Sequence, residues 1–318
     1  MSKARELASL GNAYSDGALS NRNLIINGAM QVWQRGTSHT ASGGYSADRW
    51  WMANATSVAR STEAPEGFTY SAFITASGGG NDSIGQPIEL TTGSSSPMVA
   101  GQKVTVSLYA KTVSGTDDIA ATINFRDAKY SGTNQSAFGN GDTWTVTTTW
   151  QRFTTTFTVP LINPTNVLAG LEIFGIGSSM YITGVQLEVG DTATPFEHRS
   201  YGQELALCQR FFWRLQGNST DQSLVCPAVI SGSAQARGML TLPVLMRAAP
   251  TIAEVSLEVL HNGNTAVASS LSSTLDETAY AIGLNIGADT GTPFITGQAA
   301  AIRLASSASA YIQADAEL

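Results

Sequence analysis

Aromatic residues near predicted loops are the residues of this chain whose type and placement suggest chemistry. Trp51 follows Trp50, so in a strand one indole points to the core and the other points to the opposite face. Trp144 follows the Gly-Asn-Gly-Asp sequence at 139–142, and Tyr130 lies in another glycine-containing loop. Because flat aromatic faces stack on sugar rings, Trp51, Tyr130 and Trp144 are candidates for a glycan-binding platform. The alternative is that each ring covers an interface or the rim of its domain.

Acidic pairs would be required if the protein cleaved glycans, because hydrolysis uses two facing carboxyl groups. Asp48, Asp142, Glu172, Glu188 and Glu197 lie near predicted strands, but their spacing does not say which of them face each other. The sequence contains no G-x-S-x-G, H-E-x-x-H or phosphate-binding P-loop motif. It therefore predicts a protein that is not an enzyme, with a polysaccharide depolymerase as the alternative.

Structural roles are expected for some of these acids. Asp48 stands where a loop enters a strand, so its carboxylate can accept turn amides or pair with an arginine. Glu188 and Glu197 flank Gly190-Asp191. Carboxylates in such a place can bind a structural calcium ion, which is an alternative role for these two acids. Cys208 and Cys226 fit two buried free thiols, with a disulfide between them as the alternative.

The placement of the histidines and the composition of the chain argue against several classes of ligand and location. His39, His198 and His261 are scattered along the chain and form no metal-type cluster, so neither a metal nor a cofactor is predicted. The net charge is −7 and there is no basic run, which argues against a nucleic-acid partner. No segment approaches the roughly 18 apolar residues of a membrane span. The N-terminus lacks the apolar stretch of a signal peptide, so folding in a cytoplasm is expected.

Period-two alternation dominates residues 21–199. Apolar residues at 104, 106, 108 and 110 alternate with Thr105, Ser107, Tyr109 and Lys111, and similar patterns begin at Ile119 and Phe153. One face of such strands packs on a core and the other faces water. Glycine-rich turn clusters separate the runs. The pattern predicts an all-β fold, an antiparallel β-sandwich of the jelly-roll type.

A short helix and a second β domain are expected after residue 199. Leu205, Cys208 and Phe212 fall at helical spacing, with Ser200 as the N-cap, so residues 200–216 are assigned to a connecting helix. Residues 217–318 return to strand patterns, including an Asn-Gly hairpin signal at 262–263, and form a smaller antiparallel β domain.

Two stretches carry a resemblance to a known family. The first reads N-R-N-L-I-I-N-G-A-M-Q-V-W-Q-R-G-T and continues to A-D-R-W-W, within residues 21–51. The second, residues 182–213, includes G-V-Q-L-E-V-G-D-T-A-T-P-F-E-H-R-S-Y-G-Q-E-L-A-L-C-Q-R-F-F-W. They resemble the opening and closing strands of a β-sandwich module found in fibre-type virion proteins of tailed phages. Resemblance to carbohydrate-binding modules of the jelly-roll type supports the same fold.

The resemblance implies a structural and adhesive tail fibre that contacts host surface glycans. Residues 1–20 resemble a virion-anchoring segment, in which Leu7 and Leu10 share one helical stripe too short to be stable alone. Such fibres are commonly homotrimers, and this chain has no coiled-coil heptads, so trimerisation would use β-domain faces. Apolar Leu304, Tyr311 and Ile312 near the chain end suggest one such interface.

The same resemblance implies that the protein is synthesised in the host cytoplasm and located on the virion. It also implies that the first 20 residues bind other virion proteins. A head fibre or capsid decoration protein is the alternative within this class.

Overall fold

The computed structural model describes residues 22–40, 43–89, 98–126, 134–140, 142–159, 168–272, 281–289 and 294–317. The chain divides into two compact units, and the division falls between Glu204 and Leu205. Unit 1 precedes this point and unit 2 follows it. Leu7, Leu10 and Tyr130 lie outside the described residues.

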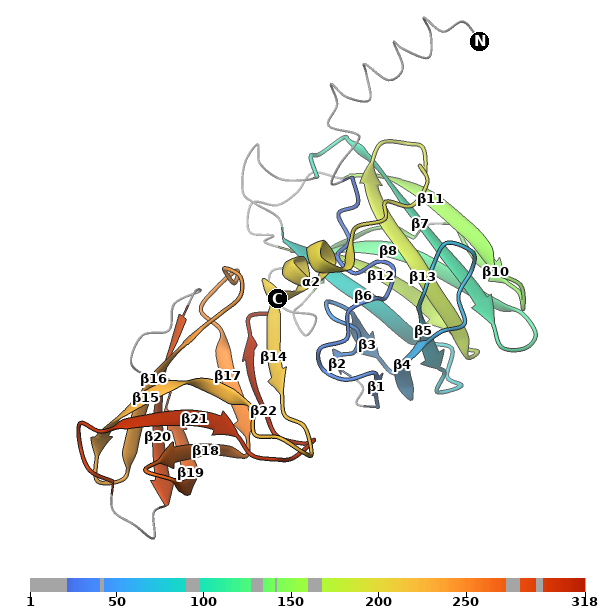
Figure 1. Cartoon of the computed structure of the whole chain (residues 1–318). Helices are drawn as coiled ribbons and strands as arrows, with labels where there is room; N and C mark the ends of the chain where they lie inside the picture. The colour runs from blue at the N-terminus through green and yellow to red at the C-terminus, as the bar shows by residue number, and fades with distance from the viewer. Residues whose placement is uncertain are drawn as a thin grey trace, which may run out of the picture. The chain divides into compact units, whose positions relative to one another are not determined.

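Unit 1 is a sandwich of two antiparallel sheets in a jelly-roll fold, coloured blue to yellow in Figure 1. The first sheet has the order β1 (Ser38–His39), β4 (Ser57–Ser61), β5 (Ser71–Thr75), β13 (Met180–Val189), β7 (Lys103–Thr112) and β11 (Gln151–Thr158). The second has the order β10 (Trp144–Val146), β8 (Asp117–Arg126), β12 (Leu168–Ile176), β6 (Asp82–Glu89), β3 (Trp51–Ala53) and β2 (Gly44–Tyr45), with β9 (Asn134–Asn140) paired to β8.

The core of unit 1 lies between these sheets, as the alternation predicts. Val104, Val106, Leu108 and Ala110 of β7 are all completely buried. Ile119, Ala121 and Ile123 of β8 join the same cluster from the facing sheet. Because side chains alternate along a strand, the residues between them point to the outer faces of the sandwich.

A helix, α2 (Tyr201–Gln209), follows the sandwich. Ser200 is its N-cap, as predicted: Gln203 N donates to Ser200 Oγ (3.3 Å) while Ser200 N donates to Gln203 Oε1 (3.1 Å). The helix is shorter than predicted, because residues 212–216 form strand β14 (Phe212–Gln216) instead. In the described part of the chain, no helix has the length and hydropathy needed to cross a bilayer.

Unit 2 is an antiparallel β domain, in agreement with the expected fold. Strand β14 belongs to a three-stranded sheet with β22 (Tyr311–Asp315) and β17 (Thr251–Val255). Six further strands close into a barrel in the order β15 (Leu224–Gly232), β16 (Gln235–Thr241), β20 (Ala281–Asp289), β19 (Asn264–Ser272), β18 (Leu257–His261) and β21 (Ala299–Leu304).

Turn chemistry sets two details of the barrel. The predicted Asn-Gly hairpin joins β18 to β19, with His261 paired to Asn264 and positive φ at Asn262 (47°) and Gly263 (76°). Ser256 also has a positive φ (58°), and it separates β17 from β18.

Two predictions about unit 2 residues can be compared with their burial. Cys208 and Cys226 are buried free thiols, as predicted. Leu304 and Ile312 cannot form the expected trimer interface, since both are completely buried in the core of unit 2. Alternation places them on the inner face of their strands, while Tyr311 lies on the other face under the guanidinium of Arg214, 3.8 Å from the ring centroid.

Candidate functional site

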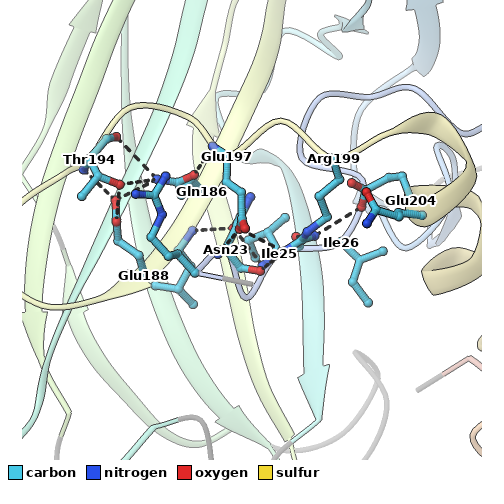
Figure 2. A network of polar contacts seen from close by, with 12 residues as sticks. Asn23, Ile25, Ile26, Gln186, Glu188, Thr194, Glu197, Arg199 and Glu204 are labelled. Carbon is cyan, nitrogen blue, oxygen red and sulfur yellow. Dashed lines mark hydrogen bonds and ion pairs between the residues drawn. The ribbon is translucent and has the colours of Figure 1, made fainter. Parts of the chain in front are cut away.

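A buried polar network joins the two sequence stretches that resemble the phage module (Figure 2). Arg199 is at its centre. Its guanidinium lies 3.5 Å from the carboxylates of both Glu197 and Glu204, and it donates to the carbonyl oxygens of Ile25 (3.0 Å) and Asn23. All three charged side chains are nearly buried, with exposed fractions between 9% and 13%. The network therefore fixes the segment at 22–27 to the segment that follows β13.

Side-chain amides complete this connection. The carboxamide of Asn23 accepts from Ile25 N (3.0 Å) and Leu187 N (3.1 Å) and donates to Val185 O (3.1 Å). Gln86 clamps Ile26 by accepting from its N–H (2.8 Å) and donating to its carbonyl oxygen (2.7 Å). These side chains substitute for strand pairing along an edge of the core, so their polar atoms are satisfied within the protein.

The N-G-A-M part of the first stretch forms a tight turn. Asn27 has a positive φ (58°), and its Oδ1 accepts from Gln31 N (2.8 Å) and Val32 N (2.9 Å). A Cβ on Gly28 would lie 2.1 Å from Val185 O, a distance that no side chain can adopt. The residue types in this motif are therefore explained by backbone packing.

Asp48 has the structural role that its position suggests. Its carboxylate is completely buried and accepts from Gln34 N (3.0 Å) and Gln34 Nε2 (2.5 Å), with Arg35 Nη1 at 3.8 Å. The other acids are held separately: Glu172 by Ser83 Oγ (2.8 Å), Glu188 by Thr194, Glu197 by Arg199, and Asp142 by Thr155 Oγ1 (3.3 Å).

The calcium alternative can be compared with the contacts of Glu188. Its Oε1 accepts from Thr194 N and Gln186 Nε2, both at 2.9 Å, and its Oε2 accepts from Thr194 Oγ1 (2.6 Å). Protein donors thus already surround the carboxylate. Within the described ranges, three or more His, Cys, Asp or Glu side chains are nowhere gathered closely enough to hold a metal ion.

Trp51 lies on the outer face of the second sheet, whereas Trp50 is in the core with 1% of its surface exposed. This agrees with the alternation expected of neighbouring tryptophans. The Trp51 ring packs edge-on against Tyr45 (centroids 5.3 Å apart), and the Arg35 guanidinium covers Tyr45 at 5.1 Å.

A row of paired residues continues from this aromatic pair across the sheet. Tyr45 pairs with Trp51, Trp51 with Gly85, and Gly85 with Glu172. Trp51 and Glu172 are both half-buried, and the buried Gly85 separates them by two strand spacings, about 10 Å. An aromatic ring can stack on a sugar, and a carboxylate can accept a hydrogen bond from a sugar hydroxyl.

Trp144 does not join this row. Its side chain is 6% exposed and stacks on Phe153, with centroids 5.7 Å apart and an interplanar angle of 28°. The expectation that Trp144 is available to stack on a sugar is wrong, because the strand after its loop turns the indole into the core between the sheets. Its ring has no open face on which a sugar could stack.

A second aromatic group, which sequence reasoning missed, lies on the outer face of the first sheet. Phe73, Tyr181 and Lys111 are paired across β5, β13 and β7, and Trp150 precedes β11 beside them. We call Phe73, Tyr181, Lys111 and Trp150 the outer aromatic row. Alternation indicated that Lys111 points outward, but one strand pattern does not predict which strands become neighbours.

Comparison with known proteins adds one family match. Residues 45–173 match the family model of a carbohydrate binding domain. The matched segment includes the Tyr45–Trp51–Gly85–Glu172 row and part of the outer aromatic row. No similar sequence was found among the curated proteins.

Solved structures give likenesses of the fold. A CBM4 structure is 19% identical over 52% of this chain and 99% of its own, with a TM-score of 0.34. The CBM22-1 xylan-binding domain of Paenibacillus barcinonensis Xyn10C is 14% identical over 54% of this chain and 96% of its own (TM-score 0.36). The enzymatically active domain of tailspike protein 4 from bacteriophage CBA120 is 17% identical over 53% of this chain, which covers 22% of that protein (TM-score 0.35). At these identities and TM-scores, the likenesses say nothing about function.

Proposed function

We propose that this chain is a structural and adhesive virion protein of the tail-fibre type, which contacts host surface glycans through unit 1. The observation that carries the glycan part is the match of residues 45–173 to a carbohydrate binding domain. The row from Tyr45 to Glu172 provides a half-buried aromatic pair and a carboxylate on the outer face of that segment. The chain binds the glycan without cleaving it.

Glycan-array binding of the full chain tests this site. Trp51→Ala and Glu172→Gln are each expected to weaken binding, with Tyr201→Ala as the control because Tyr201 is an exposed aromatic on α2. Loss of a stacking ring costs about 1 kcal/mol beyond its buried area, so the dissociation constant should rise by about five- to tenfold. Unchanged binding in both variants would contradict the proposed site, and new reducing ends after incubation with the bound glycan would contradict a non-catalytic role.

Self-association into a homotrimer through unit 2 is part of the proposal. Among described residues, the larger unit 1 has four exposed large apolar side chains, whereas unit 2 has seven: Leu224, Val229, Met239, Leu245, Val255, Val267 and Ile295. Exposed apolar surface of this kind favours an interface.

The outer surface of the barrel supports the same idea. Met239 pairs with Gly283, Pro227 pairs with Ala301, and Ala301 pairs with Leu260, so small or apolar residues recur across five strands. Light scattering at micromolar concentration should give a trimer, and Met239→Lys should shift it to monomer. A stable wild-type monomer would contradict this part of the proposal.

Docking on the particle is assigned to residues 1–20, with Leu7 and Leu10 facing another virion protein. The support is the sequence resemblance and the helical stripe, which is too short to be stable alone. Deleting residues 2–12 should leave a folded protein that is missing from assembled particles. Normal incorporation of the truncated protein would contradict this role.

A further inference from the structure

The outer aromatic row lies on the face of unit 1 opposite to Trp51. Phe73 and Tyr181 stack across neighbouring strands, with centroids 4.8 Å apart and an interplanar angle of 29°. Trp150 lies 6.2 Å from Tyr181, and Lys111 Nζ lies 5.5 Å from the Tyr181 ring and 5.8 Å from the Trp150 ring. The four side chains form one continuous group that is half-buried.

The neighbouring rows of the same sheet face are covered by the chain itself. Ser71 Oγ donates to Glu63 O (2.6 Å), and Thr183 Oγ1 donates to Tyr70 O (2.8 Å), so the segment at 62–70 lies over these buried side chains. The outer aromatic row lies just beyond this cover and remains partly open to solvent. Cross-strand stacking of Phe73 on Tyr181 stabilises the sheet and needs no ligand, but it does not account for the charged groups beside it.

Two opposite charges stand at the Trp150 end of the row. Glu63 Oε1 accepts from Lys111 Nζ (2.8 Å) and from Trp150 Nε1 (3.2 Å). Its Oε2 accepts no hydrogen bond within the described part of the chain, and the Glu63 side chain is 48% exposed. An acceptor oxygen and an ammonium group with further N–H donors are therefore held side by side at the edge of an aromatic surface.

We propose that the outer aromatic row and Glu63 form a second glycan site, which takes a neutral sugar ring with two adjacent hydroxyl groups. One hydroxyl donates to Glu63 Oε2, and its neighbour accepts from Lys111 Nζ, while the ring packs against Trp150. The opposite charges of Lys111 and Glu63 offset each other, so a charged sugar would be repelled by one of them. This inference deepens the proposed function and rests on it, but it uses a different face and different residues.

The test compares the two faces in the full chain. The probes are immobilised linear hexaoses of glucose, xylose, mannose, galactose and N-acetylglucosamine. The variants are Trp150→Ala and Glu63→Gln for this site, Trp51→Ala for the first site and Tyr201→Ala as control. Glu63→Gln keeps the shape of an exposed side chain, so it tests the site even if Trp150→Ala fails to fold.

At least one hexaose is expected to bind to Trp51→Ala and to bind about five- to tenfold more weakly to Trp150→Ala and Glu63→Gln. Tyr201→Ala should bind like the wild type. If Glu63→Gln and Trp150→Ala bind every hexaose within twofold of wild type, or if the wild-type chain binds none, the second site is wrong. If these two variants lose binding while Trp51→Ala binds every hexaose as the wild type does, the first site fails and the second stands.

Discussion

The buried network around Arg199 and the outer aromatic row both use charged side chains, but in opposite ways. Arg199, Glu197 and Glu204 are nearly excluded from water, and their contacts go to each other and to backbone groups of the segment at 22–27. Lys111 and Glu63 are also paired, yet Glu63 is half-exposed and retains an acceptor oxygen. The first arrangement holds the chain together, whereas the second can still bind something else.

This difference explains why most residues of the two recognisable sequence stretches serve the fold. Asn27, Gly28, Asp48 and Arg199 have side chains or backbone shapes that the fold requires. Residues that can contact a ligand, such as Trp51 and Trp150, lie on outer sheet faces, where many residue types are compatible with folding.

Removing Arg199 should have the largest effect on stability. Arg199→Ala leaves Glu197 and Glu204 nearly buried without their cation, which typically costs about 3–5 kcal/mol of the free energy of unfolding. Denaturant unfolding of the full chain, followed by tryptophan fluorescence, measures this loss.

The matched control is Lys103→Ala, which removes the exposed ion pair with Asp191 and should leave the same free energy almost unchanged. A loss below about 1 kcal/mol for Arg199→Ala would mean that the buried and exposed pairs do not differ in the way proposed.

Substitution of Trp144 and Trp51 should distinguish a tryptophan in the core from one on the surface. Trp144→Ala should lower the free energy of unfolding by about 3–5 kcal/mol, because it leaves a cavity beside Phe153. Trp51→Ala should cost less stability and instead weaken glycan binding. Thermal unfolding and array binding of both variants measure the contrast, and a glycan-specific defect in Trp144→Ala with unchanged stability would reverse the assignment.

The sequence predicts the sandwich well because alternation is local: Val104 to Ala110 specify an inner face whatever their neighbours are. It predicts the hairpin at Asn262-Gly263 for the same reason.

The outer aromatic row is not predictable in this way. Phe73 and Tyr181 become neighbours only through pairing of strands far apart in the chain. The burial of Trp144 is not predictable either, because the preceding glycine-rich loop indicates a turn but not the face of strand β10 on which the next side chain lies.

Ionisation of Cys226 should have a smaller effect on the stability of unit 2, and this effect depends on pH. Burial raises the pKa of its thiol from 9.0 to about 11. The neutral thiol is thus favoured in the folded state. The contribution of Cys226 to stability should be constant below about pH 9 and fall as the pH rises toward 11, since the unfolded thiol ionises first. Cys226→Ala should flatten this decline, as measured by unfolding at several pH values; an equal decline in the variant would assign it to other groups.

Lys111→Met should have the smallest effect, and it tests the open end of the outer aromatic row directly. Hydrogen bonds from Lys111 and Trp150, and the charge of Lys111, lower the pKa of Glu63 below 4.5. Any stability from this pair is present above that pH and is lost as the pH falls through the lowered pKa, but the exposed carboxylate makes the contribution small. Carbon-detected NMR titration should show the pKa of Glu63 rising toward 4.5 in Lys111→Met, with unchanged chemical shifts around Arg199. A pKa that does not move would mean that Lys111 and Glu63 are not held together in solution, and the donor and acceptor proposed to hold a sugar would then be separate groups.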